Sequence, residues 1–394
     1  MRFGLDVAQQ RIAWPELVAR AQFADALGFD GIWGFDHFQP MYGEGPGECF
    51  EGNTTLAALS GVTERVRLGL LVTGMTYRHP SVLAAEAITI DHASGGRLEL
   101  SYGAAWFDRE HAQLGIPFPP LKDRVDAFEE AVQIVRGLLT TDNFTFEGRH
   151  YSVTDATLRP RPVQQPHPPI WQTVSSPGSF RMAGELGMGI LCTTLLSPVS
   201  VLESMVAEYD AGLAACTNPV GRFVNDQRAV FTFVFCTETV DEAIKSRAAE
   251  AALWYVNAAP KVFAVPRTVW TNLIRGNVNM GAQKRSQGAV DASKVQVDLD
   301  PDDANPIVRL MNRQVLGYDI DPVEAYEALE HQDSVIIGDV DTCLRKMQKF
   351  QAAGFGRLMG LTQFGHLGHD EVMASIRRVG EAIIPALASQ PSRA

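Results

Sequence analysis

An acid and an imidazole stand directly after a short apolar run near the start of the chain. Residues 31–35 (GIWGF) are predicted to form a buried strand, and Asp36 and His37 follow it at once. In folds that alternate strands and helices, chemistry gathers at the carboxyl ends of the strands. Histidine is the side chain best suited to moving a proton near neutral pH. His37 is therefore the candidate catalytic residue; the alternative is that the Asp-His pair only caps a loop.

A second candidate is the turn after residues 170–174, which reads SSPGSF. Ser176 suits the N-cap position of a helix, and Pro177 suits its first position. The first turn lacks the Asp or Glu that commonly complements the helix dipole. Free N–H groups, small residues and no competing carboxylate suit a phosphate group. An ordinary Ser-Pro helix start is the other interpretation of this turn.

Two more strand ends carry residues that suit a flat ligand. Gly74 permits close approach to the backbone, and Thr73 and Met75 are placed to line the edge and face of such a ligand. At the second strand end, residues 102–107 read YGAAWF. There Trp106 serves equally well as a pocket wall or as a core residue.

Composition excludes several classes of protein. The chain has 394 residues, 46% of them hydrophobic and 20% charged, and a formal net charge of −12, which disfavours a nucleic-acid binder. No apolar run approaches a membrane span, so no membrane partner is expected. The five cysteines are scattered and form no C-x-x-C pair. This pattern argues against a disulfide framework or a zinc site and fits a reducing cytoplasm.

The familiar signatures of hydrolases and ATPases are also missing. The chain contains no H-E-x-x-H, P-loop, G-x-S-x-G or metal-spaced cluster of histidines and cysteines. We therefore expect no metal, and a cofactor must carry any difficult chemistry. Arg78 and His79 precede a helix that begins at Pro80, and we interpret them as helix caps.

The hydrophobic periodicity alternates between strands and helices along the whole chain. Eight strands are predicted, at 2–7, 31–35, 66–73, 97–103, 170–174, 189–193, 228–237 and 357–362. Eight tandem units predict an α/β fold, a (β/α)8 TIM barrel, built as one domain over 1–394. A doubly wound open sheet is the alternative, but the G-x-G-x-x-G turn that it would need after the first strand is absent.

Two segments exceed a minimal barrel. Residues 140–169, after the fourth strand, are predicted to form a small hairpin and a proline-rich extended lead. Residues 257–330, after the seventh strand, are predicted to form a lid-like insertion near the catalytic mouth. A surface or dimer-contact excursion is the alternative for this longer segment.

Several ordered motifs resemble the bacterial luciferase-like family of flavin- and F420-dependent oxidoreductases, which are (β/α)8 barrels. The motifs are DHF at 36–38, YRHP at 77–80, DHASGGRL at 91–98, GIPFPP at 115–120, HPPIW at 167–171 and SPGSF at 176–180. The resemblance is weaker over 257–330 and resumes in the last strand and helix.

The resemblance implies a reduced flavin, FMN, at the carboxyl end of the barrel. It places His37 beside the reactive ring as acid, base or hydrogen-bond partner, and it gives the phosphate to Ser176 and Ser179. Together with the strand-end residues described above, the predicted cofactor-binding residues are Asp36, Thr73, Gly74, Met75, Tyr102, Trp106, Val174, Ser175, Ser176, Gly178 and Ser179.

In the oxygen-using branch of the family, a separate flavin reductase supplies FMNH2, which reacts with O2 to a C4a-hydroperoxide. One oxygen atom then enters an organic substrate, and the segment 257–330 would close over the site. The aromatic residues near the strand ends suggest a substrate with an apolar body. A homodimer is expected from the family alone.

Two alternatives stay open. A hydride-transfer oxidoreductase that uses coenzyme F420 is favoured by the GAAW run at 103–106, where luciferases carry an arginine near Ala105. The Ser-Pro-x-Ser-Phe turn favours FMN instead, and Trp106 stands where F420-dependent sugar-phosphate dehydrogenases carry a proton-donating carboxylate. The other alternative is a barrel that has lost catalysis and serves as a flavin-binding or partner subunit.

Overall fold

A computed structural model describes residues 1–41, 46–194, 196–263, 267–275 and 299–388 of the chain. The strands are β1 (Arg2–Asp6), β2 (Gly31–Gly34), β3 (Arg67–Leu70), β4 (Thr73–Gly74), β5 (Leu100–Gly103), β6 (Phe144–Glu147), β7 (Ser152–Ala156), β8 (Ile170–Val174), β9 (Gly189–Thr193), β10 (Arg228–Cys236), β11 (Ile336–Gly338) and β12 (Arg357–Leu361).

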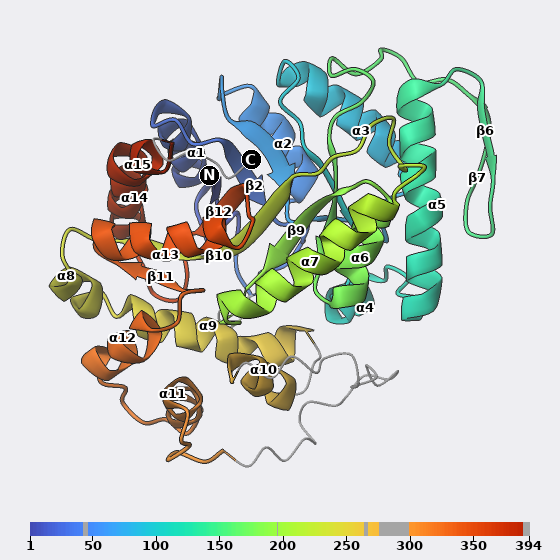
Figure 1. The fold of residues 1–394 in the computed structure, drawn as a ribbon. Helices are drawn as coiled ribbons and strands as arrows, with labels where there is room; N and C mark the ends of the chain where they lie inside the picture. The colour runs from blue at the N-terminus through green and yellow to red at the C-terminus, as the bar shows by residue number, and fades with distance from the viewer. Residues whose placement is uncertain (42–45, 195, 264–266, 276–298, 389–394) are drawn as a thin grey trace.

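Helices alternate with these strands and cover the outside of the sheet (Figure 1). They are α1 (Trp14–Ala26), α2 (Gly52–Ser60), α3 (Pro80–Ala93), α4 (Asp108–Leu114), α5 (Leu121–Thr140), α6 (Pro177–Glu185), α7 (Val199–Ala215), α8 (Val240–Lys245), α9 (Ala248–Phe263), α10 (Arg267–Ile274), α11 (Pro306–Val315), α12 (Pro322–Glu330), α13 (Val340–Ala352), α14 (His369–Arg378), the π-helical turn η1 (Val379–Ile383) and α15 (Ile384–Ala388). No helix in the described part of the chain is both long and apolar enough to cross a membrane.

The main sheet is parallel and closes into a barrel. Its strands follow the order β3-β2-β1-β12-β10-β9-β8-β5-β4. Only two residues separate β3 from β4, so these two pieces count as one interrupted strand. A parallel bridge from Leu68 to Leu98 joins β3 to the segment before β5 and completes the ring. The predicted (β/α)8 barrel is thereby confirmed.

The structure departs from the expected elements in four places. The strand predicted at 66–73 is interrupted. The hydrophobic periodicity of residues 241–254 predicts one helix, which the structure divides into α8 and α9. Arg247 has a φ of 55° at that break, a left-handed conformation that a continuous helix does not accept. The short elements α4 and β11, which pairs with β10, were not expected from the periodicity. Three residues are too few for a strand pattern to be recognised.

The two longer segments contain regular structure. Strands β6 and β7 pair antiparallel and form a hairpin that projects beside α5 (Figure 1). Helices α9 to α12 lie together on one side of the barrel (Figure 1). Residues 276–298, which contain most of the polar part of the predicted lid, lie outside the described residues. The lid role of 257–330 therefore stays a prediction.

Two tryptophans fill the interior of the barrel beneath the carboxyl ends of the strands. Trp33 and Trp171 meet edge to face, with ring centroids 6.3 Å apart. The Arg357 guanidinium lies 5.4 Å and 5.1 Å from these two rings. Phe35 and Phe231 meet edge to face at 5.7 Å, also across the barrel. The interior is therefore packed, and the chemistry must take place above it, at the strand ends.

Gly69 makes room for this packing, which gives a test of the barrel interior. A Cβ atom at this position would lie 2.3 Å from Cζ3 of Trp33, a buried ring that cannot swing away. We expect Gly69→Ala to lower the free energy of unfolding by about 1–3 kcal/mol, measured by urea denaturation. Gly61→Ala is the matched control, because its Cβ would lie 3.7 Å from the nearest atom, the Ala58 carbonyl oxygen. Equal stability of the two variants would contradict the packing described.

Candidate active site

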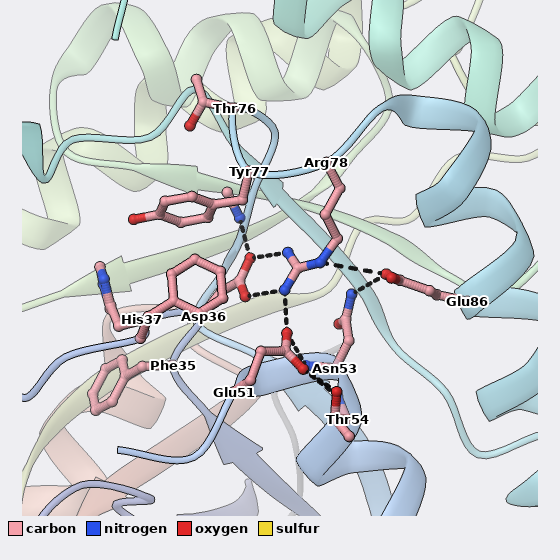
Figure 2. Close-up of polar contacts among 12 residues, drawn as sticks. Phe35, Asp36, His37, Glu51, Asn53, Thr54, Thr76, Tyr77, Arg78 and Glu86 are labelled. Carbon is pink, nitrogen blue, oxygen red and sulfur yellow. Dashed lines mark hydrogen bonds and ion pairs between the residues drawn. The ribbon is translucent and has the colours of Figure 1, made fainter. Parts of the chain in front are cut away.

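Asp36 is clamped by an arginine from the loop after β4. Arg78 donates from Nη1 to Oδ2 of Asp36 at 2.8 Å and from Nη2 to Oδ1 at 2.9 Å, a two-point ion pair (Figure 2). The backbone N–H of Gly74 also donates to Oδ2, at 2.8 Å. Asp36 is 2% exposed. Its carboxylate therefore fixes the loop after β2 against the loop after β4.

Arg78 extends this cluster to the helices outside the barrel. Its guanidinium also contacts Glu51 and lies 3.6 Å from Glu86, and Asn53 donates to Glu86 at 2.7 Å (Figure 2). Burial alone would lower the pKa of Arg78, but the three carboxylates raise it, so the cation is retained. Arg78 is thus an ion-pair partner of Asp36, and His79 alone is the helix cap, accepting from the Ser81 N–H at 3.2 Å.

His37 is held by a buried glutamate on α4. Nδ1 of His37 lies 3.0 Å from Oε2 of Glu110. The other oxygen of Glu110 accepts the backbone N–H groups of Phe38 and Gln39 at 2.8 Å and 2.9 Å. The Tyr77 hydroxyl donates to Oε2 as well. One carboxylate therefore satisfies four donors and fixes both the position and the orientation of the His37 imidazole.

The protonation states in this cluster follow from those contacts. Burial alone would raise the pKa of Glu110, but the hydrogen bonds from His37, Tyr77 and Phe38 hold it below its ordinary value, so Glu110 is ionised. Burial and the nearby Glu110 raise the pKa of Tyr77, so its hydroxyl stays protonated and donates. An ionised acceptor requires Nδ1–H on His37, which leaves Nε2 as the nitrogen available to a ligand.

Aromatic rings enclose the imidazole. The rings of Trp106 and Phe107 meet His37 edge to face, with centroids 5.3 Å and 5.6 Å away. Tyr77 stacks on His111 at 4.5 Å, and Thr76 lies 2.6 Å from Nε2 of that second histidine. The His37 side chain is only 8% exposed. Such a wall excludes bulk water while leaving one nitrogen of His37 for chemistry.

The serine-rich turn begins α6 and forms a capping box. Ser176 accepts the Ser179 N–H at 3.3 Å, and the Ser179 hydroxyl oxygen accepts the N–H groups of Ser175 and Ser176 at 3.0 Å each. The first turn of α6 contains no acid. A Cβ atom on Gly178 would meet nothing within 4 Å, so this helix start faces open space. These residues fit an anionic group such as a phosphate.

Two threonines on the inner face of the barrel were not recognised from the sequence. Thr173 on β8 and Thr193 on β9 are both exposed, although their neighbours on the same strands are buried. Thr173 follows Trp171 on the inward-facing side of β8, and Thr193 pairs with the inward-facing Phe231. Because these two inward-facing side chains are exposed, the mouth of the barrel is open beside β8 and β9. A threonine within a strand is an ordinary residue, so nothing in the sequence distinguishes these two positions from other strand positions.

The remaining predicted cofactor residues lie in different surroundings. Thr73 and Tyr102 line a cavity of about 20 Å³ that is also lined by residues of α2 and α3, which is room for one water molecule. Met75 and Val174 are buried in the core. Gly74 serves the protein itself, because a Cβ there would lie 2.7 Å from the Tyr77 ring. The structure therefore brings Asp36, His37 and Trp106 together and places the α6 turn on the same rim.

One cluster of residues has metal-ligand types but lies outside this site. Asp123, Asp126 and His150 gather on α5 and the hairpin loop, where they are only partly buried. Lys122 and Arg149 already pair with these acids at 2.7 Å and 3.2 Å. We assign no metal to this cluster.

Comparison with known proteins identifies the family. The family model described as luciferase-like monooxygenase matches residues 1–357. This chain belongs to that family. The position of the predicted DHF motif at the end of β2 and the closed barrel both agree with this membership.

Curated relatives of this luciferase-like chain use two different cofactors. The F420-dependent glucose-6-phosphate dehydrogenase of Microbacterium testaceum is 33% identical over 215 residues, which cover 54% of this chain and 63% of the relative. The FMNH2-dependent dimethylsulfone monooxygenase of Pseudomonas putida is 30% identical over 237 residues, 60% of this chain and 62% of the relative. The chain thus spans somewhat less than two thirds of the length of these relatives.

Solved structures show the same fold at lower identity. An F420-dependent secondary alcohol dehydrogenase superposes with a TM-score of 0.70 at 18% identity, over 98% of each chain. At this identity the likeness supports the barrel and nothing finer.

The Glu110 contact predicts the tautomer of His37. We expect ¹⁵N NMR of histidine-labelled protein to show a proton on Nδ1 of His37, because the ionised Glu110 accepts there. Glu110→Gln should weaken this preference, since an amide oxygen is a poorer acceptor than a carboxylate. Glu86→Gln is the control, because Glu86 contacts Arg78 and not His37. A dominant Nε2–H form in the unmodified protein would contradict the assignment.

Proposed function

We propose that this protein is an FMNH2-dependent monooxygenase of the two-component type. It would insert one atom of O2 into an organic substrate with an apolar body, and a separate flavin reductase would supply the reduced cofactor. The observation that carries the proposal is the acid-free start of α6, on the same barrel rim as the imidazole of His37. Both follow the carboxyl ends of strands in one closed ring, so both lie on the rim where a phosphate-bearing cofactor would bind.

The state of the carboxylates supports a monooxygenase over a dehydrogenase. Trp106 stands after β5, where the resemblance places the proton-donating acid of sugar-phosphate dehydrogenases. Glu110 is the buried acid nearest to His37, but it is ionised and already accepts from four donors. It therefore has no proton to give to a substrate. His37 remains the group able to hold or move a proton at Nε2.

The chain's own residues would divide the work as follows. The Gly178 N–H at the start of α6 and the serines of its capping box would bind the phosphate of the cofactor. Reduced FMN, when bound, would supply the electrons that reduce one oxygen atom to water while the other enters the substrate. Glu110 would orient His37, whose Nε2 would donate to or accept from the reacting oxygen. Trp106 and Phe107 would keep water away from that position.

A second candidate is hydride transfer with coenzyme F420. The observation in its favour is the 33% identity to the F420-dependent dehydrogenase of Microbacterium testaceum. Such an enzyme would use the same His37 and the same α6 turn but would not need O2. The flavin reductase is proposed only with the first candidate, whereas the homodimer is expected for either candidate from the family.

Oxygen dependence separates the two candidates. We expect FMNH2, supplied by an added flavin reductase, to bind and to support O2-dependent oxidation of a ketone, sulfone or aldehyde panel. Reduced F420 and oxidised F420 with an alcohol panel should support no turnover under nitrogen. The measurement is oxygen uptake coupled to product mass, together with absorbance titration of each cofactor. Anaerobic turnover with F420 would refute the monooxygenase proposal in favour of the F420 candidate. Absence of binding to either cofactor would favour a non-catalytic partner subunit.

Removal of the His37 imidazole tests its role. We expect His37→Ala to lower kcat by a factor on the order of 10² or more, because a positioned acid or base contributes that much. His92→Ala is the matched control, since His92 is exposed and its Nε2 lies 2.7 Å from the Arg161 carbonyl oxygen, outside the candidate site. Flavin titration confirms that the altered protein still binds cofactor. Unchanged turnover in His37→Ala would remove the residue from the mechanism.

A further inference from the structure

Asp6 is a buried acid at the inner rim of the barrel that the proposed mechanism does not use. It is the last residue of β1 and is 1% exposed. Its Oδ1 accepts the Ala8 N–H at 2.6 Å. Its Oδ2 is buried and has no hydrogen-bond partner among the described residues. Buried polar atoms are seldom left in this state, so Oδ2 calls for an explanation.

The side chain of Asp6 faces the interior of the barrel. Gly4, two residues earlier on β1, faces Trp33, because a Cβ there would lie 2.7 Å from the Trp33 ring. The alternation of a strand therefore turns Asp6 inward as well. In the parallel register Asp6 pairs with Leu361 of β12, which in turn pairs with Phe233 of β10. Asp6 belongs to this last paired row, at the carboxyl end where ligands bind.

Uncharged side chains surround the acid. Leu361 and Phe233 continue its row, and Trp33 is its register partner on β2. Tyr255 of α9 meets the Phe233 ring edge to face at 5.2 Å, and it is the titratable side chain that faces Asp6. No cation among the described residues offsets a charge on Asp6. Burial raises the pKa of Tyr255, and Asp6 raises it further once Asp6 is ionised, so the Tyr255 hydroxyl stays neutral.

Such surroundings keep the carboxyl group neutral at physiological pH. Burial raises the pKa of Asp6 to about 8, and the Ala8 N–H is the one contact that opposes this rise. A protonated carboxyl group donates a hydrogen bond, whereas a carboxylate only accepts. Oδ2 is therefore a buried donor without an acceptor among the described residues. A ligand oxygen would complete it.

We propose that Asp6 is a specificity-determining residue whose Oδ2–H donates a hydrogen bond to a neutral acceptor oxygen of the substrate. The substrate class is then a carbonyl, sulfoxide or sulfone compound with an apolar body, because the row of Leu361, Phe233 and Tyr255 carries no charged side chain. The inference rests on the proposed function for the reaction itself. Binding of the substrate is a separate property and can be measured without turnover.

The protonation state is tested first, by infrared difference spectroscopy between the unmodified protein and Asp6→Asn. We expect a protonated carboxyl band below pH 7 that disappears with a midpoint near pH 8. The native state keeps this proton up to pH 8, whereas the unfolded chain releases it near 3.8. The stability that the proton supplies is therefore complete below pH 3.8 and is lost as the pH rises to about 8. Asp6→Asn should gain stability relative to the unmodified protein across that window, and a carboxylate band at pH 6 would overturn the proposal.

Ligand selectivity is tested next with matched probes. Acetophenone and α-methylstyrene have nearly the same shape, but only the ketone offers an acceptor oxygen; larger ketone and alkene pairs extend the set. We expect binding by saturation-transfer NMR at pH 6.5 to favour ketones by roughly five- to tenfold, the value of one hydrogen bond. Asp6→Leu should abolish this preference. Asp6→Asn should retain part of it through its amide N–H, without loss at pH 9.

Two controls separate the ligand preference from effects on folding and from catalytic turnover. Leu5→Val alters the adjacent residue of β1, whose side chain faces the helices, and should keep the ketone preference. Equal preference in Asp6→Leu, or no ketone preference in the unmodified protein, would overturn the assignment. The assay is run with and without FMN. A retained ketone preference without oxygen uptake would remove the proposed function and leave Asp6 as the substrate donor.

Discussion

The carboxylate of Glu110 is the interaction on which the candidate site depends. It accepts from the imidazole of His37, from two backbone N–H groups of the following residues and from the Tyr77 hydroxyl. These donors come from the loop after β2 and the loop after β4, while the acceptor is on α4. A buried ion is costly unless its hydrogen bonds are complete. The hydrogen bonds of Glu110 are complete here, so they hold the two loops and α4 in a fixed arrangement and give His37 a single orientation.

The other acids at the mouth of the barrel are also compensated or kept neutral. Asp36 is neutralised by Arg78, Glu110 is stabilised by neutral and imidazole donors, and Asp6 avoids ionisation. These three acids therefore present no uncompensated charge to the start of α6. A helix N-terminus attracts an anion only when nearby carboxylates do not compete for it. The arrangement of the acids on one side of the rim is therefore a condition for anion binding on the other.

The sequence predicted the barrel because its signals are local and repeated. Each strand carries its own apolar run and each helix its own periodicity, so eight units could be counted without knowing any long-range contact. The DHF motif and the α6 turn were found for the same reason, since each sits at a strand end. Arg78 was interpreted as a cap, because nothing local indicates that its guanidinium reaches Asp36 across 42 residues.

Glu110, Tyr102 and Asp6 show what local patterns cannot provide. Glu110 lies on α4, a seven-residue helix too short for a periodic signal, 73 residues from the His37 that it orients. Tyr102 lies on β5 next to Gly103. Because side chains alternate along a strand, the Tyr102 side chain points toward α2 and α3 and not toward the mouth. The direction of a side chain depends on register, and register is set by neighbours far apart in the chain.

The apolar row beside Asp6 explains why an acid and a neutral substrate suit each other at this rim. Leu361, Phe233 and Tyr255 make ionisation of Asp6 unfavourable, and the same low polarity favours the burial of a hydrocarbon body. An apolar wall alone discriminates weakly between ligands of similar shape. A neutral acid in that wall adds direction, because its one proton can be satisfied only by an acceptor at one position. Selectivity then arises from the free-energy cost of leaving that donor unpaired. The ionised Glu110 cannot act as such a donor, because it has no proton and already accepts four hydrogen bonds from the protein.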